Sequence, residues 1–303
     1  MSFVGLDGTG GRELADGDSS ADAAPWEEEA GAVRSPRRPR RTSSTTAPPS
    51  SSVHQVEAGV WMVTGTNVNW AVVSDGASVT LVDAGYPRDL PRVLAALEHL
   101  GHRPEDVVAI ALTHAHLDHI GGVPGLVELA GPAVWTGDDE VAHAARTGAE
   151  QVSVAQLLWT ARRPAGARWV AQTLRAVLPH TRIRVPSARG LSAGAVLDAP
   201  GQLVAVPTPG HTSGHTAFLM PSTGVLFSGD ALVTGHPVSR PPDGAQLLPQ
   251  PFNHDEDRAV ASLSHLAALP ASVVAPGHGP FVRRPVQELV DEALTRYHRD
   301  RSS

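Results

Sequence analysis

Six consecutive residues of the chain hold four groups that could bind a metal ion. In the stretch THAHLDHIGG, residues 113–122, these groups belong to His114, His116, Asp118 and His119. Imidazole nitrogens and carboxylate oxygens are common zinc ligands. The chain contains no cysteine, so any metal must be bound by His, Asp or Glu.

The spacing divides these four residues between two metal ions. On an extended segment, residues two positions apart point to the same side, and the apolar run VVAIALT before His114 predicts such a segment. His114 and His116 can therefore converge on one ion. Asp118 and His119 are expected in the turn that follows, pointing elsewhere, and a second ion nearby would explain them.

Three further candidate ligands each follow an apolar strand and adjoin Gly or Pro. They are His211 in TPGHTSGH, Asp230 in LFSGDAL and His278 in VVAPGHGP. The predicted sets are His114, His116 and His211 for one ion, Asp118, His119 and His278 for the other, with Asp230 bridging them. Three protein ligands and a bridging group leave room for water, which is typical of a catalytic zinc.

The elements that must position these residues begin near Val53. Residues 1–52 lack hydrophobic periodicity and are predicted to be a disordered tail, followed by one domain over 53–303. Short strands are expected within 53–85, 107–113, 202–230 and 271–279, and helices over 88–101, over 255–269, from about 285 and through an insertion at 138–180. The two groups of strands predict two β-rich halves with helices outside and the insertion beside the active site.

Composition and charge exclude several classes of protein. The net charge of −7 disfavours a dedicated nucleic-acid binder, although all 24 basic residues are arginine. No apolar run approaches the roughly 20 residues that span a bilayer. No apolar segment follows the paired arginines of the tail, so an export signal is rejected and a cytoplasmic protein is expected.

The ordered set of motifs resembles the metallo-β-lactamase superfamily, and specifically its hydroxyacylglutathione hydrolase branch. The motifs are Asp83 in LVDAG, the run HAHLDH, and the residues His211, Asp230 and His278. The resemblance implies an α/β (α+β) fold, a four-layer αββα sandwich with the site at one edge of two sheets. It also implies that Asp83 orients a ligand histidine. His215 is a candidate for a similar supporting role, the alternative being a structural one.

The predicted activity is hydrolysis of a small-molecule ester, thioester, lactone or similar acyl substrate. Two zinc ions per chain, with iron or manganese as alternatives, would carry a bridging hydroxide as the nucleophile. Asp118 is the predicted proton-transfer residue. The stretch TPGHTSGH is similar to the thioesterase pattern, whereas the lack of lysine argues against glutathione itself as substrate. Trp70 and Trp159 are candidate substrate-pocket residues.

Two other activities found in this superfamily are weighed against acyl hydrolysis. A persulfide dioxygenase binds one iron and usually carries an Arg-Thr-Asp-Phe stretch soon after the fourth motif, where this chain reads SGDALVTGHPVSRPP. An RNase Z-like phosphodiesterase has a basic recruitment arm, which the core of this sequence lacks. Both remain alternatives. The sequence leaves the oligomeric state open.

Overall fold

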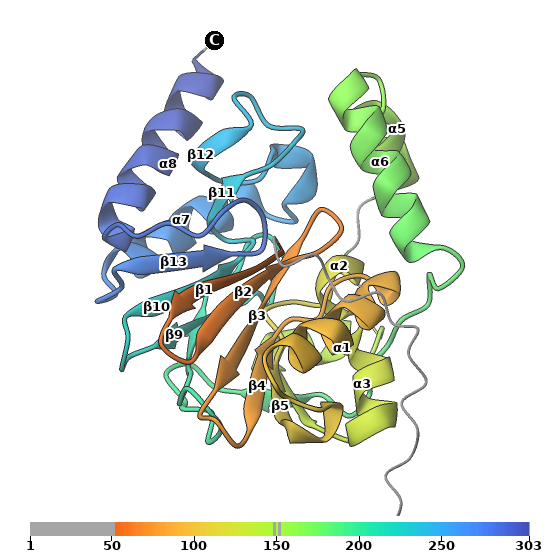
Figure 1. Cartoon of the computed structure of the whole chain (residues 1–303). Helices are drawn as coiled ribbons and strands as arrows, with labels where there is room; N and C mark the ends of the chain where they lie inside the picture. Colours follow the sequence, from red (N-terminus) through yellow and green to blue (C-terminus); the bar gives the residue numbers. More distant parts are fainter. Residues whose placement is uncertain (1–51, 148–149, 151–152, 303) are drawn as a thin grey trace, which may run out of the picture. The chain divides into compact units, whose positions relative to one another are not determined.

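The computed structural model of the chain describes residues 52–147, 150 and 153–302. The predicted tail over residues 1–52, apart from Ser52, lies outside these described residues. Figure 1 shows strands stacked between helices, with the helices α5 and α6 forming a separate pair. No helix of the described part of the chain is long and apolar enough to cross a membrane.

The first sheet has seven strands in sequence order. Its strands are β1 (Val53–Glu57), β2 (Val60–Thr64), β3 (Asn69–Ser74), β4 (Val79–Val82), β5 (Val107–Ala111), β6 (Ala133–Gly137) and β7 (Arg189–Leu191). The first four strands run antiparallel to one another, and β4 to β7 run parallel. The parallel half places the segment after β5 at the carboxyl edge of the sheet.

The second sheet has four strands in the order β13, β10, β9, β8. Its strands are β8 (Val204–Pro207), β9 (Thr216–Met220), β10 (Val225–Gly229) and β13 (Val273–Pro276), and β11 (Val233–Gly235) pairs separately with β12 (Asp243–Gln246). β9 is antiparallel to both β8 and β10, and β13 is parallel to β10. The carboxyl ends of β8, β10 and β13 therefore lie at one edge.

The helices differ in length from single turns to sixteen residues. They are α1 (Leu90–His99), α2 (Leu117–Ile120), α3 (Val123–Ala130), α4 (Val141–Ala144), α5 (Val154–Thr160), α6 (Pro164–Val177), α7 (Glu256–Ala267) and α8 (Val286–Arg301). Short 3-10 turns, among them η2 (Pro87–Asp89) and η4 (Asp138–Glu140), precede α1 and α4. The predicted insertion at 138–180 thus contains η4, α4, α5 and α6.

Both faces of the central strands are buried, which produces four layers. In β3, Trp70 and Val72 pack against a cluster that includes α1 and α3, while Ala71 and Val73 pack against the second sheet. A third cluster joins the second sheet to α7 and α8. A strand that is covered on both faces has apolar residues at successive positions instead of at every second one, and β3 shows this from Trp70 to Val73. The predicted four-layer αββα sandwich is confirmed.

Candidate metal centre

The seven predicted ligands meet at the edge where the carboxyl ends of the strands lie. His114 and His116 follow β5, and α2 carries Asp118 and His119. The other three, His211, Asp230 and His278, follow β8, β10 and β13. The structure differs from the sequence prediction at Asp118 and His119, which lie in the single helical turn of α2 rather than in an irregular turn. The helical turn does not turn His119 away from His114, because the centroids of the two rings are 4.1 Å apart and both residues share a third candidate group with Asp230.

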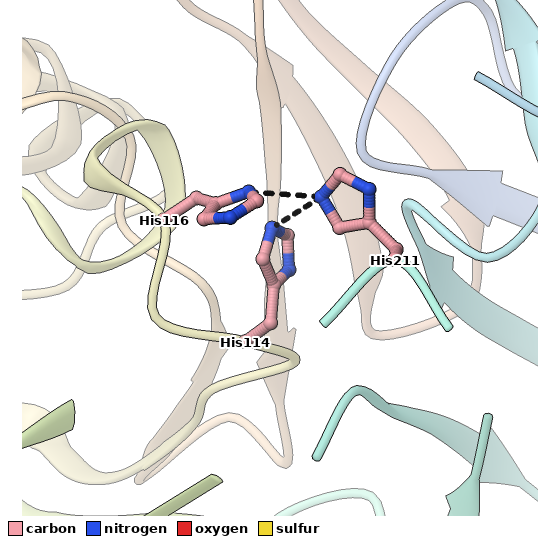
Figure 2. Close-up of side chains that lie close together, drawn as sticks. All are labelled: His114, His116 and His211. Carbon is pink, nitrogen blue, oxygen red and sulfur yellow. Dashed lines mark hydrogen bonds between the residues drawn. The ribbon is translucent and has the colours of Figure 1, made fainter. Parts of the chain in front are cut away.

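The first group consists of His114, His116 and His211, all buried. The Nε2 atom of His211 lies 3.2 Å from His114 Nε2 and 2.9 Å from His116 Nδ1. Figure 2 shows the three rings converging from two sides, with dashed lines joining these nitrogen atoms. The i, i+2 spacing therefore does place His114 and His116 on one side of the segment.

The second group consists of Asp118, His119 and His278. Asp118 Oδ2 lies 3.6 Å from His278 Nε2 and 3.8 Å from His119 Nε2. The Asp118 side chain is 16% exposed, while both histidines are buried. Asp118 is thus the most exposed member of this group.

Asp230 lies between the two groups and contacts both. Its Oδ2 atom is 3.4 Å from His211 Nε2 and 3.1 Å from His278 Nε2. Its Oδ1 atom is 3.4 Å from His119 Nε2. A carboxylate in this position can offer one oxygen to each of two neighbouring ions.

The residues fit metal ions better than they fit one another. Two ligand atoms bound to one tetrahedral zinc at 2.0–2.1 Å are about 3.3 Å apart, close to the separations found here. His119 Nε2 and Asp230 Oδ1, 3.4 Å apart, are buried and neither makes a hydrogen bond with the described residues. An unpartnered buried polar atom is costly, and a cation would satisfy both.

The outward-facing nitrogens of three ligand histidines have hydrogen-bond partners. His114 Nδ1 lies 3.1 Å from Thr113 Oγ1, and His278 Nδ1 lies 2.7 Å from the carbonyl oxygen of Asn67. His211 Nδ1 lies 3.4 Å from Asn253 Oδ1. With the ring proton on Nδ1, each Nε2 presents a lone pair to the centre. Lone pairs that face each other repel unless a cation lies between them.

Asp83 supports the second group. Its Oδ2 accepts hydrogen bonds from His119 Nδ1 and from Thr113 Oγ1, both at 2.8 Å, and its Oδ1 accepts from the Thr113 N–H at 2.8 Å. Asp83 adopts a left-handed backbone conformation, φ +62°, which residues other than glycine rarely adopt. A carboxylate held this firmly fixes both the tautomer and the ring plane of His119.

His215 acts on Asp230 rather than on a ligand histidine. Its Nε2 accepts a hydrogen bond from the Asp230 N–H at 3.0 Å, and its Nδ1 lies 2.7 Å from Thr208 Oγ1. Burial lowers the pKa of His215 to about 4, so the ring is neutral and can accept. A Cβ at Gly229 would lie 2.6 Å from His215 Nε2, which explains the glycine before Asp230.

The ligand histidines fall into two electrostatic classes. Burial and the neighbouring histidines hold the pKa of His114 and His211 well below 6.5, so both are neutral as metal ligands must be. Burial also lowers the pKa of His119, but Asp230 and Asp83 outweigh it and raise the pKa well above 6.5. A cation bound at the second group would replace the proton on His119, so metal binding there releases protons.

Glu140, which sequence reasoning missed, joins the two loops that carry the first group. Its Oε1 accepts a hydrogen bond from the Ala115 N–H at 2.8 Å, and its Oε2 accepts from Thr212 Oγ1 at 2.7 Å. The residue is fully buried. In the sequence it ends the acidic run Asp138-Asp139-Glu140, which is typical of a solvated turn, so no local signal marks it.

A cavity of about 930 Å³ opens beside the metal centre. His116, Asp118, Asp230 and His278 line it together with apolar residues. These apolar residues are Leu157, Trp169, Leu174, Val177, Leu248 and Phe252. The insertion and the loop after Asp230 therefore both contribute to its wall.

The two tryptophans predicted for the pocket lie elsewhere. Trp70 is 2% exposed and packs in the core with α1 and α3. Trp159 is 48% exposed and lines a separate depression next to α8. Trp169, ten residues further along, lines the cavity instead. The helical register explains this difference, because α6 turns Trp169 inward, whereas Trp159 on α5 points outward.

The comparison with known families agrees with this geometry. The model of the metallo-beta-lactamase superfamily matches residues 63–278, which include every candidate ligand. The chain belongs to the metallo-beta-lactamase superfamily. This assignment accounts for the ligand types and their order, and for the four-layer fold.

Individual relatives are distant but extensive in coverage. The uncharacterized protein YobT of Bacillus subtilis is 31% identical over 73% of this chain and 87% of its own length. A hydroxyacylglutathione hydrolase of Xanthomonas euvesicatoria is 32% identical over 70% of this chain and 60% of its own length. The crystal structure of a metallo-beta-lactamase family protein from Thermus thermophilus superposes with a TM-score of 0.57 at 25% identity, covering 82% and 81% of the two chains.

Proposed function

We propose that the protein is a metal-dependent hydrolase with two zinc ions per chain, acting on a small acyl substrate such as an ester, thioester or lactone. The observation that carries the proposal is the pair of ligand groups joined by Asp230 and open to one cavity. His114, His116 and His211 would hold one ion. Asp118, His119 and His278 would hold the other. Similarity to a hydroxyacylglutathione hydrolase supports acyl hydrolysis as the reaction class.

The chemistry divides between the metal ions and the residues of the chain. When bound, the ions supply a water molecule of lowered pKa and positive charge for the developing oxyanion. Hydrolysis of a thioester breaks the acyl C–S bond and adds water, giving a carboxylic acid and a thiol. Asp118 lines the cavity and is placed to accept the proton from the attacking water and return it to the leaving group. Apolar residues such as Trp169 exclude bulk water and bind the acyl part.

Metal analysis combined with a substrate panel tests this proposal. Purified protein is expected to hold close to two zinc ions per chain and to hydrolyse at least one member of a panel of thioesters, esters, lactones, β-lactams and phosphodiesters. His116→Ala should abolish turnover with an unchanged circular dichroism spectrum, because it removes a ligand of the first group. His265→Ala, on an exposed position of α7, is the matched control.

Three results would contradict the proposal. Iron at one ion per chain with oxygen consumption would favour the dioxygenase. Turnover restricted to phosphodiesters would favour the nuclease. Activity retained in His116→Ala would exclude the metal-dependent mechanism altogether.

A further inference from the structure

Three arginines line the same cavity as the metal ligands His116 and Asp118. They are Arg146, Arg182 and Arg184, and all come from the segment between β6 and β7. The remainder of the wall is largely apolar, so the cavity combines a hydrocarbon-like surface with a cluster of positive charge. The metal centre does not use these arginines.

The backbone brings the three arginines together. Arg146 Nε donates a hydrogen bond to the carbonyl oxygen of Ile183 at 2.6 Å, and the Val185 N–H donates to the carbonyl oxygen of Ala144 at 2.8 Å. The segment that carries Arg182 and Arg184 therefore runs against the end of α4. Arg146 itself adopts a left-handed backbone conformation, φ +61°, which residues other than glycine rarely adopt. These contacts hold the Arg146 side chain and the backbone of the segment, while the side chains of Arg182 and Arg184 are exposed.

Within the described residues, none of the three arginines forms an ion pair with a carboxylate, although the charge of Glu140 acts on Arg146. Arg146 Nη2 is buried and has no hydrogen-bond partner among the described residues, and burial lowers the pKa of Arg146. The ion pairs found among the described residues use other arginines, such as Arg92 with Asp89, and none includes Arg146, Arg182 or Arg184. A buried charged donor without an acceptor is costly, and a bound anion would remove that cost.

The sequence around Arg182 and Arg184 also has an excess of positive charge. Residues 151–197 contain seven arginines and no aspartate or glutamate, in a chain whose net charge is −7. Most arginines of such a segment simply face solvent. Arg146, Arg182 and Arg184 differ because they line the cavity that also contains the candidate metal ligands.

We propose that Arg146, Arg182 and Arg184 bind a carboxylate or phosphate of the substrate, remote from the acyl bond that is cleaved. The inference rests on the proposed hydrolase function and narrows its substrate class to anionic acyl compounds. Guanidinium groups form paired, charge-assisted hydrogen bonds with such anions. The apolar wall, including Leu157, Trp169 and Leu174, accepts the hydrocarbon part of the same molecule.

The test compares pairs of substrates that differ only in the anion. S-octanoylpantetheine and its 4′-phosphate place the charge on the leaving group. The octanoyl and the monosuberoyl thioesters of N-acetylcysteamine place it on the acyl group. Wild-type protein is expected to show kcat/KM about tenfold or more higher for the anionic member of at least one pair. In the double variant R182Q/R184Q this preference should fall to near unity while turnover of the neutral members stays unchanged.

The control and a second measurement keep the outcome unambiguous. Arg175→Gln removes the same charge from an exposed position of α6 outside the cavity lining, and it should retain the preference. Titration calorimetry with the corresponding S-alkyl thioethers, which cannot be hydrolysed, measures the same preference without turnover. Anion preference in binding without hydrolysis of any thioester, ester or lactone would refute the proposed function but support the anion site. No preference in either pair, or one that R182Q/R184Q retains or Arg175→Gln also loses, would overturn the inference.

Discussion

Replacing the carboxylate of Asp83 with an amide is expected to weaken one half of the metal centre. Asp83 Oδ2 accepts from His119 Nδ1 and Asp83 Oδ1 accepts from the Thr113 N–H, each at 2.8 Å. In Asp83→Asn, the amide oxygen can keep the Thr113 contact only if the NH₂ group faces His119. His119 Nδ1 must then accept, and its proton moves to Nε2, the atom that faces Asp118 and Asp230. The opposite amide orientation leaves the buried Thr113 N–H facing a donor instead.

The size of the effect follows from the role of such supporting hydrogen bonds. Their loss typically lowers metal affinity about 10- to 100-fold, or about 1.4–2.7 kcal/mol. The loss should be larger at the group with His119 than at the group with His114, His116 and His211. Zinc titration of the metal-free protein in competition with a chromophoric chelator resolves the two affinities.

The matched control is Asp75→Asn. Asp75 is an exposed carboxylate that accepts hydrogen bonds from the Ala77 and Ser78 N–H groups in the turn between β3 and β4. It should leave both zinc affinities unchanged. If Asp83→Asn binds two zinc ions with wild-type affinities, or loses the group with His114 first, then the reasoning about the His119 tautomer is wrong.

Three further predictions concern stability, metal dependence and the tail. Glu140→Gln should lower the free energy of unfolding by about 1–3 kcal/mol in urea titrations, because one of two buried charge-assisted hydrogen bonds is lost. The nearby His143, whose Nδ1 lies 3.4 Å from Glu140 Oε2, and the hydrogen bond from Thr212 hold the pKa of Glu140 below 4.5 despite its burial. Glu140 in turn raises the pKa of His143 above 6.5, so the difference in stability should be largest between pH 4.5 and 6.5. A chelator should abolish turnover, and zinc should restore it. Removal of residues 1–50 should leave kcat unchanged.

Each of these predictions has an outcome that contradicts it. A Glu140→Gln protein with wild-type stability at pH 5.5 would show that the two loops do not depend on the buried carboxylate. Turnover that survives exhaustive chelation would exclude a metal-dependent reaction. A large fall in kcat after removal of residues 1–50 would show that the tail contributes to catalysis.

The fold and the meeting of the candidate ligands at one edge could be predicted because their signals are local in the sequence. His211, Asp230 and His278 each directly follow an apolar strand, and strands that share a direction bring their ends to one edge. The apolar runs of β3 and β5 likewise indicate strands covered on both faces. These features depend only on neighbouring residues and on general rules of sheet geometry.

The supporting and lining residues could not be predicted because they depend on tertiary contacts. Glu140 meets Ala115 and Thr212 only after three separate segments have packed together. Trp159 and Trp169 have similar local sequence environments, and the register of the helices decides which one faces the cavity. Neither the hydrogen bonds of Glu140 nor the position of Trp169 in the cavity wall is indicated by the residues next to them in the sequence.

Each ligand group draws residues from both halves of the sandwich. His114 and His116 follow the first sheet and His211 follows the second, while His119 and His278 divide in the same way. Bound metal would therefore link the two sheets. It would raise the free energy of unfolding by about 2.7 kcal/mol at a free metal concentration 100 times the dissociation constant. A cell short of the metal would lose the protein as well as its activity, because chains without bound metal would unfold and be degraded sooner. The abundance of the protein would then follow the metal supply without any dedicated regulator.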